Sequence, residues 1–123
     1  MWRLTAKGEM TMEPSPGVFV TNAARDDEWQ PDPEVPGSLM HELVHADGLH
    51  AGLSRFIEVD GPVTWTPETR EVAMVLEGSV RIEVADGETL VLGPGDLFSL
   101  PPGRETTWHV TTPFKEMWVL AAD

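Results

Sequence analysis

The 123-residue chain contains no cysteine, which excludes a disulfide framework, a thiolate metal site and a cysteine nucleophile. It has no apolar run near the roughly 18 residues that a membrane-spanning helix requires. Basic residues are also few: 8 lysines and arginines stand against 21 aspartates and glutamates, and the formal net charge is −13. Because such an acidic protein repels phosphate backbones and anionic lipid, we expect neither a nucleic acid nor a membrane as a partner.

Residues 1–9 lack the apolar segment that a signal peptide needs. Together with the absence of cysteine, this favours a cytoplasmic protein. The length suits one domain with a single core. No amphipathic run long enough for a helix stands out, apart from a turn or two after Ser38, so the sequence predicts an all-β fold.

Residues 1–37 differ in character from the rest of the chain. They are rich in proline and poor in regular apolar spacing, which predicts an extended N-terminal arm with one strand over residues 17–21. Trp2 and Trp29 are large apolar side chains in this polar stretch, and we expect them to anchor the arm onto another surface. Residues 38–123 are then expected to form a β-barrel.

Alternating apolar and polar residues dominate the chain after residue 62. Residues 80–84 alternate strictly, which is the pattern of a half-buried strand. Asp86-Gly87 is a hairpin turn signal, and residues 89–92 form the returning strand. Further strands are expected over residues 97–100, 106–110 and 115–121. Short strands separated by turns at about ten-residue spacing indicate a sandwich or a barrel.

Two glycine-anchored motifs resemble those of the cupin superfamily. Glu71 and Gly78 have the spacing of the first cupin motif. Gly95, Pro101 and Gly103 match the second motif. Residues 49–121 are similar to the ethanolamine-utilisation-type and ureidoglycine-aminohydrolase-like cupins in particular. The resemblance implies a single-domain, RmlC-like jelly-roll barrel (a double-stranded β-helix) with a central pocket.

The positions at which cupins usually carry metal-binding histidines hold other residues in this chain. They fall within residues 64–67 in the first motif and at Thr106 in the second. A divalent metal site needs about three or four nitrogen or oxygen ligands, and Glu71 supplies one. We therefore expect no cofactor and no metal in the pocket. A divalent metal stays open as an alternative in which histidines such as His50 arrive from other strands.

The segment from His41 to His45 reads H-E-x-x-H, the spacing of zinc proteases. That chemistry requires both histidines on one face of a helix and a third ligand, which the spacing would place at Ala51. Asp47-Gly48 would end any such helix early. We therefore disfavour a zinc protease and interpret the segment as a strand, with both histidines on the face opposite Glu42.

The cupin resemblance also implies which side chains face the pocket. The candidate site residues are Glu71, Trp65, Thr106, Trp108 and His50. The tryptophans would form an aromatic wall for a ligand, or would simply fill a small barrel. His109 is out of phase with Trp108, so it is expected to face outward.

Two functions are compatible with this pocket. The first is a binding protein that holds a small organic molecule in an aromatic-walled pocket without the usual cupin metal. The alternative is a small enzyme of the isomerase, lyase or hydrolase type, with or without a non-standard metal. In that case Glu71 is the catalytic acid or base, with a pKa raised by desolvation. No residue names a substrate, and whether the protein is an enzyme stays open.

A homodimer is also expected. Val72, Met74 and Leu76 would form an apolar outward face, and with Trp2 and Trp29 they are more hydrophobic than a monomer surface should be. A second copy would cover these residues, with or without exchange of the N-terminal arms, as is common among the cupins that the chain resembles.

Overall fold

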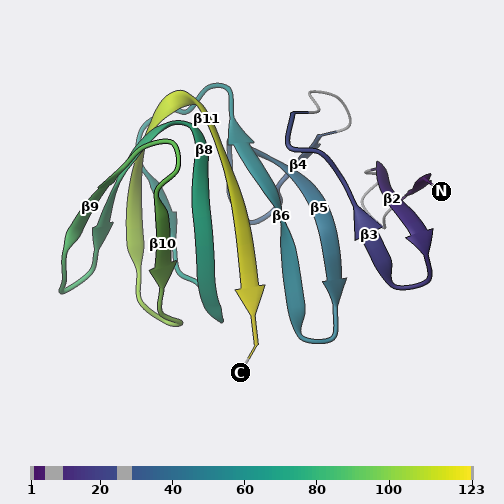
Figure 1. Cartoon of the computed structure of the whole chain (residues 1–123). Helices are drawn as coiled ribbons and strands as arrows, with labels where there is room; N and C mark the ends of the chain where they lie inside the picture. The colour runs from purple at the N-terminus through teal and green to yellow at the C-terminus, as the bar shows by residue number, and fades with distance from the viewer. Residues whose placement is uncertain (1, 5–9, 25–28, 123) are drawn as a thin grey trace.

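The computed structural model describes residues 2–4, 10–24 and 29–122, and every regular element within them is a β-strand (Figure 1). The strands are β1 (Trp2–Leu4), β2 (Met10–Ser15), β3 (Val18–Val20), β4 (Gln30–Pro31), β5 (Ser38–Ala46), β6 (Leu49–Phe56), β7 (Val63–Trp65), β8 (Arg70–Val84), β9 (Thr89–Leu92), β10 (Leu97–Leu100) and β11 (Thr106–Ala121). None of the described residues belongs to a helix long and apolar enough to cross a membrane. The prediction of an all-β fold is confirmed.

One large antiparallel sheet carries most of the chain. Its strands follow the order β10-β8-β11-β6-β5-β4, with β9 paired to β8 and β7 paired to β11. The long strands β8 and β11 lie side by side at its centre (Figure 1) and pair along nearly their whole lengths. Each long strand changes its other neighbour halfway along: β11 pairs with β7 and then with β6, and β8 pairs with β10 and then with β9. The architecture is the expected single-domain, RmlC-like cupin barrel.

Gly78 lies where β11 bulges toward β8. The pairing of these strands shifts register between Thr111 and Lys115. Gly78 has a φ of +78°, and a Cβ atom there would collide with the carbonyl oxygen of Pro113. Any other residue at this position would therefore strain its own backbone and push β11 away. This is the physical reason for the glycine of the first motif.

Alternation along β8 separates the core from the outer surface. Ala73 and Val75 are buried, whereas Val72 between the buried positions is 44% exposed. Beyond Gly78, Val80 and Ile82 are buried again, so the predicted alternation over residues 80–84 is confirmed. Aromatic side chains from other strands complete the core: Phe56, Phe98, Trp108, Phe114 and Trp118.

The N-terminal segment contains more strands than were expected for an extended arm. The expected strand is present as β3, but β1, β2 and β3 together form a separate three-stranded antiparallel sheet. In addition, β4 pairs with β5 and so joins the main sheet. The expectation of a single strand before residue 38 was wrong, because β1 has three residues and β2 contains a proline, so neither shows the long uninterrupted alternation that marks a strand in a sequence.

Side chains of this segment attach it to the outer face of the barrel. Thr21 Oγ1 lies 2.7 Å from His41 Nε2 on β5, and Lys115 Nζ on β11 donates to the carbonyl oxygen of Ala23 at 3.0 Å. The ring of Trp29 packs 5.8 Å from the His41 ring and 5.3 Å from the Arg55 guanidinium. The anchoring role expected of Trp29 is confirmed; the side chain of Trp2 lies outside the described part of the structure.

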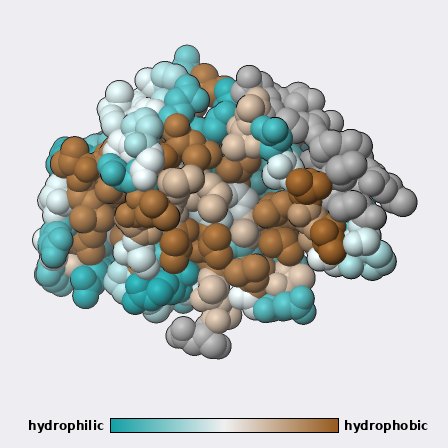
Figure 2. Space-filling view, in the orientation of Figure 1, coloured by the Kyte–Doolittle hydropathy of each residue, from teal (hydrophilic) through white to brown (hydrophobic). Residues whose placement is uncertain are grey.

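The outer face of β8, β10 and β11 is apolar. Cross-strand pairing aligns Leu97, Met74 and Met117 in one row, and Val72 and Val119 in the next. Leu97 is 69% exposed and Met117 is 39% exposed. Figure 2 shows apolar residues gathered across the middle of the face on which β8 and β11 lie.

Candidate functional site

The inner face of the sheet encloses a cavity of about 490 Å³. Side chains from β5, β6, β7, β8 and β11 line it, together with the segment that follows β4. Of the candidate site residues, Glu71, Trp65, Trp108 and His50 lie on its wall. The cavity is therefore the place where four of the five side chains singled out in the sequence come together.

Glu71 reaches the cavity because it is on the inward-facing phase near the start of β8, where it is 4% exposed. Trp65, on β7, donates its indole N–H to Glu71 Oε1 at 2.7 Å. The tryptophan thus occupies the space beside the glutamate and orients it at the same time.

A second carboxyl group, Glu116 on β11, shares the cavity and was missed in the sequence. It is 4% exposed, and its Oε2 atom is buried without a hydrogen-bond partner among the described residues. The available signal was its position: Glu116, Trp118 and Leu120 alternate with outward residues on β11, so a charged residue lies in an inward phase.

The two carboxyl groups do not titrate like exposed glutamates. Burial raises the pKa of Glu71 from 4.5 to about 7, although the hydrogen bond from Trp65 lowers it in part. Burial also raises the pKa of Glu116 well above its usual range, and the neighbouring charge of Glu71 raises it further. Two carboxylates in one poorly solvated space repel each other, so ionisation of one disfavours ionisation of the other.

Thr106 supports the aromatic wall from behind. It is 1% exposed and is not among the described residues that line the cavity, unlike the other candidates. Its hydroxyl donates to the carbonyl oxygen of Trp65 at 2.6 Å and accepts the indole N–H of Trp108 at 2.8 Å. The expected ligand contact by Thr106 is therefore replaced by a positioning role for two tryptophans.

Trp118 forms a third aromatic part of the wall and was not singled out in the sequence. Its indole N–H donates to Ser54 Oγ at 2.7 Å, and its ring meets the His50 ring edge-on at 4.8 Å. The indole N–H groups of all three cavity tryptophans therefore donate hydrogen bonds to other groups of the protein. What they present to the cavity is apolar ring surface.

The usual cupin metal does not fit the residues present at its position. Glu71 is the one metal-binding side chain at the motif positions, and the indole N–H of Trp65 already occupies its Oε1 atom. Pro67 is fully buried and Thr106 is committed to two other hydrogen bonds. Even with the neighbouring carboxyl group of Glu116, two ligand residues are fewer than the roughly three or four that a divalent transition-metal site needs. That no metal binds at this usual cupin position stays a prediction.

The H-E-x-x-H segment lies on strand β5, so the helix that a zinc protease requires does not exist. His41 faces the outer side toward Thr21, as a strand predicts. His45 does not share that side, however, because Leu43 has no cross-strand partner and forms a bulge between Glu42 and Val44. The bulge places His45 on the same inner side as Glu42, which corrects the predicted phase.

His109 faces away from the cavity, as predicted. Its Nε2 atom lies 3.1 Å from Glu83 Oε1 on the neighbouring strand β8. Arg81 donates to the same carboxylate oxygen at 2.6 Å. This outer cluster is an ordinary exposed ion-pair arrangement.

Comparison with known proteins agrees with this architecture. Residues 58–117 match the family model described as the EutQ-like cupin domain. No curated protein sequence matches the chain significantly. The protein is thus a cupin-type protein in fold. Its resemblance to EutQ-type cupins in particular is confirmed.

Three solved structures illustrate the likeness. A putative ethanolamine utilization protein Q from Salmonella typhimurium is 20% identical, covers 98% of this chain and 95% of its own, and has a TM-score of 0.71. KdgF from a Halomonas species is 24% identical, with 77% and 87% coverage and a TM-score of 0.63. An RmlC-like cupin from Shewanella frigidimarina is 23% identical, with 71% and 78% coverage and a TM-score of 0.61. These similarities establish the fold.

Proposed function

We propose that this protein binds a small organic molecule that has a compact, partly apolar body and at least one hydrogen-bond donor group. The observation that carries the proposal is the content of one cavity: three tryptophan rings and two buried carboxyl groups, one of which has an oxygen without a partner among the described residues. The aromatic walls would pack against the apolar body of the ligand, and the carboxyl groups would accept hydrogen bonds from its donor group.

The size and walls of the cavity support a small ligand. A volume of about 490 Å³ falls within the range of small-molecule sites. The rings of Trp65, Trp108 and Trp118 offer apolar faces because their N–H groups are bound elsewhere. Met40 and Phe56 add further apolar surface. A flat or compact apolar body would remove all of this surface from water.

The carboxyl groups support a ligand that donates hydrogen bonds. Buried polar atoms in proteins almost always have a partner, and Glu116 Oε2 has none among the described residues. A hydroxyl or ammonium group of a ligand would supply it. A carboxylate or phosphate would instead meet two acidic side chains inside a protein of net charge −13, so anionic ligands are disfavoured.

A matched series of probes tests this proposal. Benzylamine, benzyl alcohol and benzoate share one aromatic body and differ in head group, and binding is measured by saturation-transfer NMR and by the shift in melting temperature. We expect benzylamine and benzyl alcohol to bind and benzoate not to bind. Ethanolamine, suggested by the name of the Salmonella protein, has donors without an aromatic body and should bind more weakly than benzylamine.

Single substitutions test whether the probes bind in the cavity. Glu116→Gln should weaken benzylamine binding more than benzyl alcohol binding, because the amide cannot lose a proton and form an ion pair with a bound ammonium group. Glu83→Gln removes an exposed carboxylate on the outer side of β8 and should change the affinity for neither benzylamine nor benzyl alcohol. Equal affinity for all three aromatic probes, or an equal effect of the two variants, would contradict the proposal.

A second candidate function, acid–base catalysis, is favoured by one observation. Burial raises the pKa of Glu71 to about 7, where a carboxyl group can both accept and return a proton at neutral pH. The test is to follow the NMR spectrum of each bound compound for chemical conversion. Conversion by the wild-type protein and not by Glu71→Gln supports an enzyme, and the absence of conversion for every compound that binds supports the binding role.

A further inference from the structure

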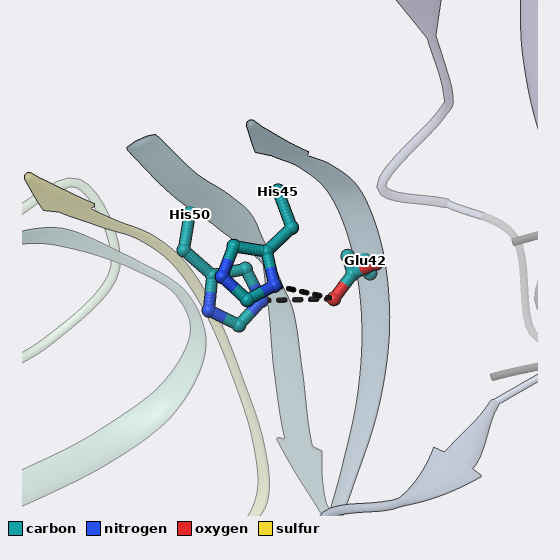
Figure 3. A group of neighbouring side chains, drawn as sticks. All are labelled: Glu42, His45 and His50. Atoms are coloured by element: carbon teal, nitrogen blue, oxygen red, sulfur yellow. Dashed lines mark hydrogen bonds and ion pairs between the residues drawn. The ribbon is translucent and has the colours of Figure 1, made fainter. Parts of the chain in front are cut away.

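A group of three potential metal ligands lies at one end of the cavity, apart from the usual cupin position. It consists of Glu42 and His45 on β5 and His50 on β6. One nitrogen of each histidine and one oxygen of the glutamate lie within 4.8 Å of one another. Figure 3 shows the two imidazole rings stacked, each with a nitrogen turned toward the Glu42 carboxylate.

The geometry of the group is close to that of a loaded site. His50 Nε2 lies 2.9 Å from Glu42 Oε2, and His45 Nδ1 lies 4.0 Å from the same oxygen. Ligand atoms bound to one metal ion at about 2.0–2.2 Å lie a little over 3 Å apart. To share one ion, the two stacked rings would have to rotate until both nitrogen lone pairs point at it, and the His45 nitrogen would have to move closer to Glu42.

Two local features of the backbone build this group. The bulge at Leu43 turns Glu42 and His45 to the same side of β5, which an unbroken strand would not do. The turn at Asp47-Gly48, with φ values of +56° and +76°, then sets His50 directly opposite His45. Their rings stack with centroids 4.0 Å apart.

Gly52 makes room for the bulge. It pairs with Glu42, and a Cβ atom there would lie 2.5 Å from the carbonyl oxygen of His41. The hairpin therefore depends on a glycine at this position to keep β5 close to β6. On the other side of His50, the edge-on ring of Trp118 fixes the orientation of the imidazole, as supporting residues do in metal sites.

We propose that Glu42, His45 and His50 bind one divalent transition-metal ion, of the Zn²⁺ or Ni²⁺ type, at this end of the cavity. Two imidazole nitrogens and a carboxylate oxygen form a ligand set that these ions prefer, and three protein ligands leave coordination positions free. His45 and His50 both line the cavity, so a free position faces the space in which an organic ligand would lie. His45, with 66% of its side chain exposed, gives the ion access from solvent.

The experiment uses the metal alone and the full chain. Protein stripped with a chelator is titrated with ZnCl₂ or NiCl₂ by calorimetry, and bound metal is counted after dialysis. We expect one ion per chain. Co²⁺ should give visible d–d absorption bands, which report nitrogen and oxygen ligands directly. Since no organic ligand is present, the result is independent of the proposed binding function.

Single substitutions identify the ligands. His45→Ala, His50→Ala and Glu42→Gln should each weaken binding by at least about tenfold. His45 is exposed, so His45→Ala is expected to fold normally and keeps the test informative if another variant does not. His109→Ala is the matched control, because His109 also contacts one glutamate but lacks a second histidine.

Three results would overturn the proposal. One is the absence of stoichiometric binding by the wild-type protein. Another is equal binding by His45→Ala and the wild-type protein. The third is loss of binding in Glu71→Gln together with retention in His50→Ala, which would place the ion beside the buried carboxyl groups.

Discussion

Glu71 and Glu116 come from neighbouring strands, and their carboxyl groups share one space from which water is largely excluded. The hydrogen bond from Trp65 favours the ionised form of Glu71, whereas burial favours the neutral form of both groups. Burial is the larger effect. The pair therefore changes its protonation close to neutral pH, and this has consequences for stability as well as for ligand binding.

Stability should decrease as the pH rises through neutrality. Between pH 4.5 and about 7 the folded protein retains a proton on Glu71 that the unfolded chain has released, so the free energy of unfolding falls over this range. The shift corresponds to about 3 kcal/mol. Glu71→Gln keeps an acceptor for Trp65 and removes the titration, so urea denaturation should show a flatter pH dependence and greater stability at pH 8. Glu83→Gln should follow the wild-type curve, and an unchanged slope in Glu71→Gln would refute the argument.

Thr106→Val should loosen the tryptophan wall without changing its volume much. The substitution removes the hydroxyl that joins the Trp65 carbonyl oxygen to the Trp108 indole, and both are left in a buried site. We expect a loss of about 1–3 kcal/mol in urea denaturation. Thr111→Val, at an exposed position of the same strand, should change stability by less than about 0.5 kcal/mol. Equal effects of the two variants would show that the buried hydroxyl is not needed.

Motif spacing placed Glu71, Trp65 and Trp108 in the inward phase, and all three side chains line the cavity. Sequence reasoning missed Glu116, since a lone glutamate between Lys115 and Met117 looks like a solvated residue until the strand register is known. It also misjudged Thr106, which lies in the inward phase but is covered by the two tryptophans that it holds. The alternation along a strand predicts which face of the sheet a side chain lies on. Whether that side chain then reaches the cavity depends on the size of the side chains around it.

At the level of elements, the β5–β6 hairpin shows where an alternating pattern stops being informative. Strict alternation puts His45 on the side of His41, and one extra residue at Leu43 reverses this. Nothing in the residue types of this segment marks a bulge. The glycine opposite, Gly52, is the one sequence feature that accompanies it, because a strand glycine often marks close backbone approach.

Gly52→Ala should therefore damage the hairpin. The added Cβ would lie 2.5 Å from the His41 carbonyl oxygen, which is backbone and cannot rotate away. We expect a loss of about 1–3 kcal/mol in urea denaturation and weaker Zn²⁺ binding in calorimetry. Gly93→Ala is the control, since a Cβ there would meet nothing within 4 Å, and it should be nearly neutral. If Gly52→Ala were as stable as Gly93→Ala, β5 and β6 could not be packed as closely as described.

The barrel strands were predictable because each lies between turn residues and shows apolar alternation. The turn at Asp86-Gly87 and the strands over residues 89–92 and 97–100 agree with the prediction, whereas the two strands expected over residues 106–110 and 115–121 are one continuous strand, β11, with a bulge between them. The N-terminal sheet was not predictable in the same way. Apolar and polar residues alternate in β1 and β2, but β1 has three residues, β2 contains a proline and β4 has two residues. These stretches are too short or too irregular to predict strands, and cross-strand pairing is what defines them.

For the molecule as a whole, the apolar outer face of β8, β10 and β11 is relevant to whether the protein is a monomer or a dimer. We propose that a second copy of the chain covers this face. Leu97, Val72 and Met117 are exposed on it, and rows of methionine and valine connect them. A chain of net charge −13 would repel its own copy, so the association has to rely on this uncharged surface. Trp29, expected to contribute, already packs within the chain.

Light scattering at micromolar concentration should give the mass of a dimer. Leu97→Glu adds a charge at an exposed position on this face and should shift the mass to that of a monomer while leaving the circular dichroism spectrum unchanged. Val91→Glu, at a 78% exposed site on β9 opposite Arg81, should remain dimeric. A monomeric wild-type protein would contradict the proposed dimer.

The five tryptophans provide a direct measurement of whether the cavity is a ligand site. Each indole N–H gives one signal in the ¹H–¹⁵N NMR spectrum, assigned by single Trp→Phe substitutions. Titration with benzylamine should move the signals of Trp65, Trp108 and Trp118, which line the cavity, and leave that of Trp29 on the outer face in place. If saturating benzylamine left the three cavity signals unmoved, or moved the Trp29 signal alone, the cavity would not be the binding site.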